Sequence, residues 1–123
     1  MQNDSSKFKV EFKKRLYAWV IRLINFIDTL PKTSVCDIIG KQLLRSGTSI
    51  LANYIEGGSA SSKKDFINFF NHSLKSSNES KVWLSILNDT NKGDKNELKY
   101  LLDELTQIAN IFASSILTMK GKK

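Results

Sequence analysis

The chain has 123 residues, a formal net charge of +7 and a hydrophobic content of 41%. This length suits one hydrophobic core, so we expect residues 1–123 to form a single domain. The basic balance raises the expectation of a polyanionic partner, because clustered lysine and arginine side chains release counterions from phosphates. The single cysteine, Cys36, excludes an intramolecular disulfide bond and fits a reducing compartment.

The sequence also bears on localisation. No apolar run approaches the roughly 18 residues of a membrane span, and the polar start MQNDSSK lacks the apolar region of a signal peptide. We therefore expect a cytoplasmic protein without a membrane partner. One proline, six glycines and long stretches free of β-branched clusters favour helices over many short strands.

A first helix is predicted over residues 7–30, where apolar residues recur at steps of four and three until Pro31. This apolar stripe consists of Phe8, Phe12, Leu16, Trp19, Leu23, Ile27 and Leu30. The other faces of the helix carry a basic set made of Lys7, Lys9, Lys13, Lys14, Arg15 and Arg22. Two interpretations stay open, a solvated lysine face and a nucleic-acid-binding surface, which Lys41 or the tail 120–123 would extend.

A second helix is predicted over residues 35–57, where Ser34 with Asp37 resembles a capping box and Gly57 and Gly58 end the helix. It carries two parallel seams at helical spacing. The apolar seam consists of Leu43, Gly47, Ile50 and Tyr54, and the polar seam of Gln42, Arg45, Ser49, Ala52 or Asn53, and Glu56. Such a helix packs on its own core and against a polar partner.

A third helix is predicted over residues 63–88, started by Ser62 with Asp65. Small hydroxyl residues line one of its faces, and the second helix offers matching small residues. They are Ser73, Ser76, Ser77 and Ser80 on the third helix, and Ser46, Gly47, Ser49 and Ala52 on the second. Because small residues permit close approach, we infer that the two helices pack tightly as an antiparallel hairpin.

A fourth helix is predicted over residues 95–119, started by Asp94 with Glu97 and followed by an almost unbroken apolar stripe. Four such helices joined by short links predict an all-α protein, an antiparallel up-down-up-down four-helix bundle. In the hairpin of the second and third helices, Arg45 comes level with Glu79, so a contact between them is geometrically possible. An ion pair or subunit contact and direct ligand binding are both open for this pair.

The sequence offers no catalytic constellation. His72 stands two helical turns, roughly 10 Å, from both Asp65 and Glu79, which is too far to share a metal ion. Cys36 has no convincing Cys/His pairing, and no glycine-rich phosphate loop follows a strand. We therefore expect no enzymatic activity, no metal and no cofactor.

Three stretches carry a family resemblance: QLLRSGTSILANYIEG at 42–57, KDF at 64–66 and SLKSSNESKVWLSIL at 73–87. Together they resemble the four-helix-bundle family first described as proteins encoded in intervening sequences of bacterial large-subunit ribosomal RNA genes. Trp19 and the sequence LPK at 30–32 also fit, so the resemblance covers almost the whole chain. It implies a bundle that assembles into a homopentameric ring, related to the accessory variability determinant of diversity-generating retroelements, which binds nucleic acid and a reverse transcriptase.

The residues that match family positions are Gln42, Arg45, Ser46, Ser49, Asn53, Glu56, Gly57 and Glu79. The chain departs from the family at Ser76, where many members have glutamate, and at Ser80, where they have threonine. We predict a packing or oligomer motif, which consists of Gln42, Arg45, Ser46, Gly47, Ser49, Asn53, Glu56 and Glu79. The first hypothesis for function is a basic, oligomeric bundle that binds RNA or DNA, as an accessory factor to a ribonucleoprotein or reverse transcriptase. The alternative is a protein-interaction scaffold with no direct nucleic-acid role.

Overall fold

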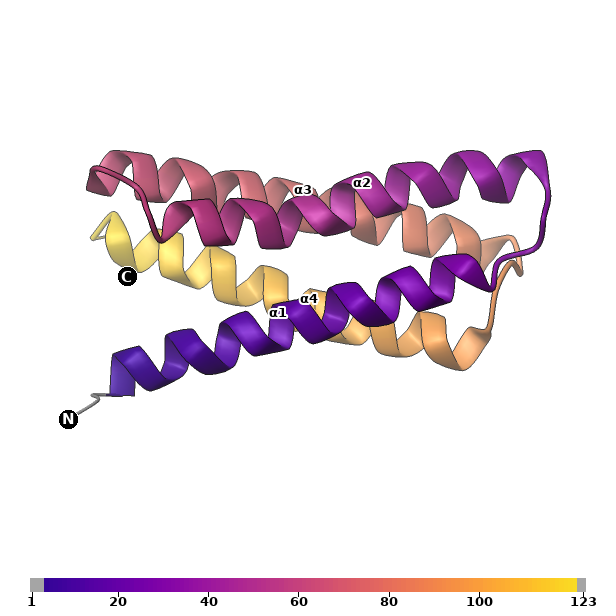
Figure 1. Ribbon diagram of the computed structural model, residues 1–123, viewed down its shortest axis with the longest axis horizontal. Helices are drawn as coiled ribbons and strands as arrows, with labels where there is room; N and C mark the ends of the chain where they lie inside the picture. The colour runs from indigo at the N-terminus through magenta and orange to yellow at the C-terminus, as the bar shows by residue number, and fades with distance from the viewer. Residues whose placement is uncertain (1–3, 122–123) are drawn as a thin grey trace.

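The computed structural model describes residues 4–121, which form four α-helices (Figure 1). The helices are α1 (Asp4–Asp28), α2 (Ser34–Gly57), α3 (Lys63–Asp89) and α4 (Lys95–Met119). No strand occurs in this part of the chain. The all-α prediction is confirmed, and the arrangement is consistent with a four-helix bundle.

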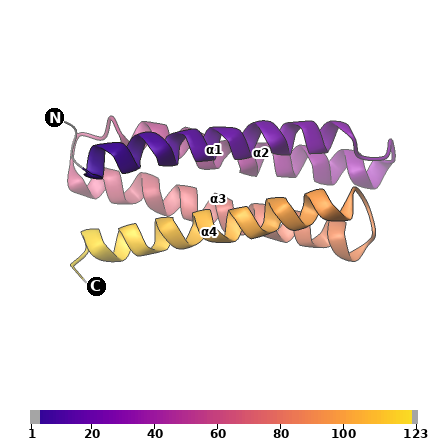
Figure 2. The same cartoon turned by 90° about the horizontal axis from the view of Figure 1, so that it is seen from below.

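Consecutive helices pack side by side and run in opposite directions (Figures 1 and 2). α1 contacts α2 and α4, and α3 contacts α2 and α4, so the chain passes around the bundle in sequential order. The most extensive helix contact is between α2 and α3. One consequence is that the start of α1, the end of α2, the start of α3 and the end of α4 all lie at the same end of the bundle (Figure 1).

The core combines the apolar stripes of α1 and α4 with fewer residues from α2 and α3. In α1 the predicted stripe is buried from Phe12 to Leu23 and again at Leu30, but Phe8 is 53% exposed. Phe8 lies near the start of α1 and outside the core, and Phe26 is buried where the stripe predicts Ile27. The fully buried Trp19 indole donates a hydrogen bond to the Leu101 carbonyl at 3.1 Å.

Two of the three predicted helix caps are confirmed. Ser62 accepts a hydrogen bond from the Asp65 amide at 3.1 Å, and Asp94 accepts one from the Glu97 amide at 2.8 Å. The predicted start at Ser34 is wrong. Thr33 caps α2 instead, because its backbone is extended while Ser34 is already helical, and its hydroxyl accepts from the Cys36 amide at 3.2 Å.

Gly47 lies at the contact between α1 and α2, not at the predicted contact between α2 and α3. A Cβ atom at this position would overlap the Leu23 side chain of α1, and the Trp19 ring lies 3.5 Å away. The inference that Gly47 helps α2 approach α3 is therefore wrong. Its missing side chain lets α2 approach α1 closely. Gly57 allows close approach to α3 instead, since a Cβ atom added there would lie 3.3 Å from the Phe69 Cβ.

Candidate nucleic-acid interface

Four lysines of the predicted basic set are solvent-exposed along the first turns of α1. They are Lys7, Lys9, Lys13 and Lys14. None of the four takes part in an ion pair with another side chain that the structure describes. Their ammonium groups therefore present positive charge to the solvent, as a phosphate-contacting surface requires.

The two arginines of the predicted set are paired with α4. Arg15 donates to both carboxylate oxygens of Glu104, at 2.6 and 2.8 Å, and to the Gln107 side chain at 2.7 Å. The same hydrogen bonds raise the pKa of Arg15 and lower the pKa of Glu104. Bidentate pairing neutralises the guanidinium and ties α1 to α4.

Arg22 repeats this arrangement two turns later. Its Nε and Nη2 atoms donate to the Glu97 carboxylate at 2.7 and 3.0 Å, and its guanidinium lies 3.5 Å from the centre of the Tyr100 ring. The spacing of the residues in the sequence could have indicated both pairs. Arg15 and Arg22 are seven residues apart on α1, and Glu97 and Glu104 are seven residues apart on the antiparallel helix α4. The lysines and the arginines of the predicted set therefore have different surroundings.

The topology brings further lysines to the same end of the bundle. Lys63 and Lys64 begin α3, and Lys120 follows α4. When the helices are divided at their midpoints, residues 4–16, 46–76 and 107–121 carry nine basic and four acidic residues. We call this half the basic end. The opposite half, residues 17–45 and 77–106, carries eight of each and is neutral.

Lys41, which was expected to extend the basic surface, lies on the neutral half. Its ammonium is 3.6 Å from the Asp37 carboxylate one turn earlier. Of the tail 120–123, only Lys120 and Gly121 belong to the described residues, so Lys122 and Lys123 lie outside them. The positive charge of the described chain is thus concentrated at one end rather than spread along α1.

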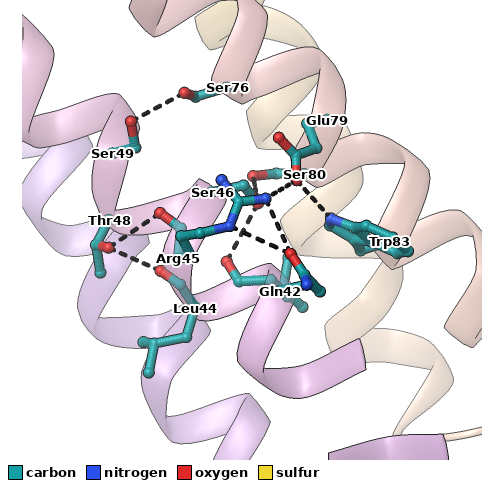
Figure 3. Close-up of polar contacts among 11 residues, drawn as sticks. Gln42, Leu44, Arg45, Ser46, Thr48, Ser49, Ser76, Glu79, Ser80 and Trp83 are labelled. Atoms are coloured by element: carbon teal, nitrogen blue, oxygen red, sulfur yellow. Dashed lines mark hydrogen bonds and ion pairs between the residues drawn. The ribbon is translucent and has the colours of Figure 1, made fainter. Parts of the chain in front are cut away.

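The predicted contact between Arg45 and Glu79 is confirmed as an ion pair between α2 and α3 (Figure 3). Gln42 accepts from the Arg45 guanidinium at 3.0 Å, and the Trp83 indole donates to Glu79 at 3.0 Å. The pair is open to solvent, since 57% of the Arg45 side chain is exposed. An exposed pair of this kind contributes only about 0–1 kcal/mol to stability.

The serines form the buried part of the α2–α3 contact, as expected for close approach. Ser46 and Ser80 share a hydrogen bond of 2.7 Å across the helices, and the Ser73 hydroxyl donates to the Ile50 carbonyl at 2.9 Å. Ser46, Ser73, Ser77 and Ser80 are all fully buried. Buried hydroxyls with partners on the facing helix fix the distance and register of the two helices.

Nearer the basic end, a second polar group continues the seam. The Ser76 hydroxyl donates to the Ser49 hydroxyl at 3.0 Å, and the Asn53 amide donates to the Ser49 hydroxyl and carbonyl at 2.9 Å (Figure 3 shows the serine pair). Glu56 is exposed and joins neither group in the described contacts. Most of the predicted motif therefore lies in the α2–α3 contact, while Gly47 faces α1.

The candidate catalytic side chains lie apart. His72 is exposed on α3, and Cys36 is buried in the first turn of α2. Within residues 4–121, no group of three or more histidine, cysteine, aspartate and glutamate side chains could hold a metal ion. The same part of the chain contains no helix with the length and apolar character needed to cross a membrane.

Comparison with known proteins places these features in one family. The sequence model of the 23S rRNA-intervening sequence protein family matches residues 9–114. A similar solved structure is the 1.70 Å crystal structure of a protein of unknown function from the S23 ribosomal protein family of Bacteroides thetaiotaomicron. It is 33% identical, with a TM-score of 0.79 over 85% of this chain and 97% of that chain. The chain has no significant match among curated protein sequences.

Proposed function

The chain belongs to the family of 23S rRNA-intervening sequence proteins, and we propose that it is a non-enzymatic bundle that binds nucleic acid through its basic end. The observation that carries the proposal is the charge asymmetry: five net positive charges on one half of the bundle and none on the other. A field concentrated on one face attracts a polyanion more strongly than the same charge spread evenly. RNA and DNA share the phosphates that such a field selects.

The exposed lysines suit phosphate contact without base readout. A lysine ammonium is a compact, flexible point charge, so it follows a phosphate backbone without imposing one geometry. Arg15 and Arg22 already use their planar groups on Glu104 and Glu97, and they hold α1 in place. In this account the lysines bind and the two arginines position the helix that carries them.

Paired charge reversals test the proposal. Lys7→Glu with Lys14→Glu removes charge from the basic end, and Lys32→Glu with Lys41→Glu makes the same change in net charge on the neutral half. Binding of a fluorescently labelled RNA, measured by anisotropy at about 50 mM salt, should weaken at least roughly tenfold in the first variant and little in the second. Equal effects of the two variants would show that only net charge matters, and would contradict a defined site.

We extend the proposal to assembly, because α1 exposes an apolar stripe opposite its core face, outside the basic end. The stripe consists of Tyr17 and Ile21, which are one helical turn apart and each more than 40% exposed. Burial of this stripe between copies would form a homo-oligomer, which the resemblance suggests is a pentamer, and would multiply the basic ends around one axis. Light scattering should report an oligomer for the unaltered chain and a smaller mass for Ile21→Glu.

The resemblance also suggests a reverse transcriptase as a partner. The position of the gene in the genome tests this suggestion. A gene beside a reverse transcriptase and repeat sequences supports the retroelement role, whereas a position inside a ribosomal RNA gene does not. The competing function is a protein-interaction scaffold, which the exposed apolar residues of α1 also favour. An intact oligomer without RNA or DNA binding near about 50 mM salt would support the scaffold instead.

A further inference from the structure

The basic end contains an apolar groove where the four helices meet. It has a volume of about 480 Å³ and is lined by residues from α1, α2, α3 and α4. Aromatic side chains make up much of the lining: Phe8, Phe12, Tyr54, Phe66 and Phe70. Its size falls within the range of small-ligand sites.

The rings offer flat faces near the mouth of the groove. Phe8 stacks almost parallel to Phe12, with 5.8 Å between ring centres and 6° between planes, yet half of Phe8 is exposed. Phe66 lies 4.5 Å from Phe70 across a 30° tilt and is half-buried. A planar group that enters the groove would therefore meet ring faces.

The charged side chains at the rim of the groove favour a ligand with a negative charge. Lys9 and Lys13 are one helical turn apart and both line it, whereas no aspartate or glutamate does. A ligand that fits must combine a flat apolar part with an anion at a short distance. A nucleotide in a single strand has this composition, since each base is followed by a phosphate.

We propose that the groove takes unpaired bases of a single-stranded nucleic acid, while Lys9 and Lys13 contact the adjacent phosphates. This inference rests on the proposed function and deepens it, because it names single strands as the preferred form. A base-paired duplex keeps its bases stacked on one another and presents only their edges, so it cannot place a base face on Phe8. Stacking on aromatic side chains accepts every base, so the groove gives preference for single strands with little sequence selectivity.

A short RNA strand that carries the fluorescent base 2-aminopurine tests the inference. It is compared with an abasic strand, which has the same phosphates without bases, and with a duplex of the same sequence. The expected results are quenching of 2-aminopurine on binding, and binding of the intact strand about tenfold tighter than the abasic strand. Phe8→Ala should remove this advantage and leave abasic and duplex binding unchanged.

Two further variants separate stacking from general apolar contact. Phe8→Leu keeps the apolar character without a ring face, so it should resemble Phe8→Ala. Ile38→Ala removes an exposed apolar side chain from α2 on the neutral half and should leave binding of every strand unchanged. Because Phe8 is half exposed, its replacement does not open the core, and circular dichroism confirms that each variant is folded.

The outcomes distinguish the groove from the basic end as a whole. Equal affinity for intact and abasic strands, with no effect of Phe8→Ala, overturns the groove and leaves the proposed function standing. Failure of all three nucleic acids to bind overturns both. If Phe8→Ala weakens binding of an acidic amphipathic peptide of glutamate and leucine but not of the intact strand, the groove is a peptide site and the inference is wrong.

Discussion

Replacement of Gly47 by alanine tests how closely α2 approaches α1. In a helix interior the change from glycine to alanine by itself stabilises a helix by about 1 kcal/mol. At Gly47 the added methyl group overlaps Leu23, which is fully buried beside Trp19 and has little room to change its rotamer. Overpacking of this kind costs about 1–3 kcal/mol, which cancels or exceeds the gain.

Gly40 provides a matched control seven residues earlier on the same face of α2. A Cβ atom there would lie 3.4 Å from Ile27 and 3.8 Å from Leu30, which is ordinary van der Waals contact. Since Gly40→Ala receives the same gain in helix propensity without the overlap, it should be neutral or stabilising. We expect Gly47→Ala to be less stable than Gly40→Ala by about 1–3 kcal/mol.

Urea unfolding followed by circular dichroism measures this difference, at one protein concentration so that any assembly contributes equally. The two variants should unfold with similar slopes and different midpoints. A Gly47→Ala variant as stable as Gly40→Ala would refute the reasoning, because it would mean that the α1–α2 contact can open to admit a methyl group.

Two other predictions concern the α2–α3 and α1–α4 contacts. Ser80→Ala removes the buried partner of Ser46 and should lower the free energy of unfolding by about 1 kcal/mol. The double variant with Ser46→Ala should lose less stability than the sum of the two single variants. Additive losses, measured by urea unfolding, would contradict the hydrogen bond between the two serines. The pKa of Glu104 is lowered from its ordinary value of 4.5 by Arg15, so the unfolded state binds a proton more readily. The pair therefore contributes stability above pH 4.5 that is lost as the pH falls through the lowered pKa, and Glu104→Gln should flatten the pH dependence of the urea midpoint in that range. An unchanged pH profile would show that the pair does not influence folding.

The sequence predicted the helices well because their signals are local. Apolar residues at steps of three and four, Pro31, and the pairs Ser62 with Asp65 and Asp94 with Glu97 each act within one or two turns. The choice between Thr33 and Ser34 depends on backbone angles at a loop, which spacing does not encode. The contact between Arg45 and Glu79 could be predicted because a short turn between α2 and α3 fixes their register.

Contacts between helices distant in sequence were harder to predict. Gly47 was assigned to α3 because serines there offered a match, whereas its neighbour is Leu23 of α1. Arg15 was grouped with the lysines because the pairing with Glu104 depends on which helices are adjacent. The basic end and its groove likewise arise from topology, which brings four separate segments together.

The salt dependence of RNA binding tests the central claim most directly. Each phosphate contacted on a duplex contributes a slope of about −0.9 to the plot of log affinity against log salt concentration, and about −0.7 on a single strand. If the four exposed lysines of α1 each contact one phosphate, a single strand should give a slope of about −3 between about 50 and 200 mM salt. Binding that does not change with salt, or no binding at about 50 mM salt, would contradict a function based on the basic end.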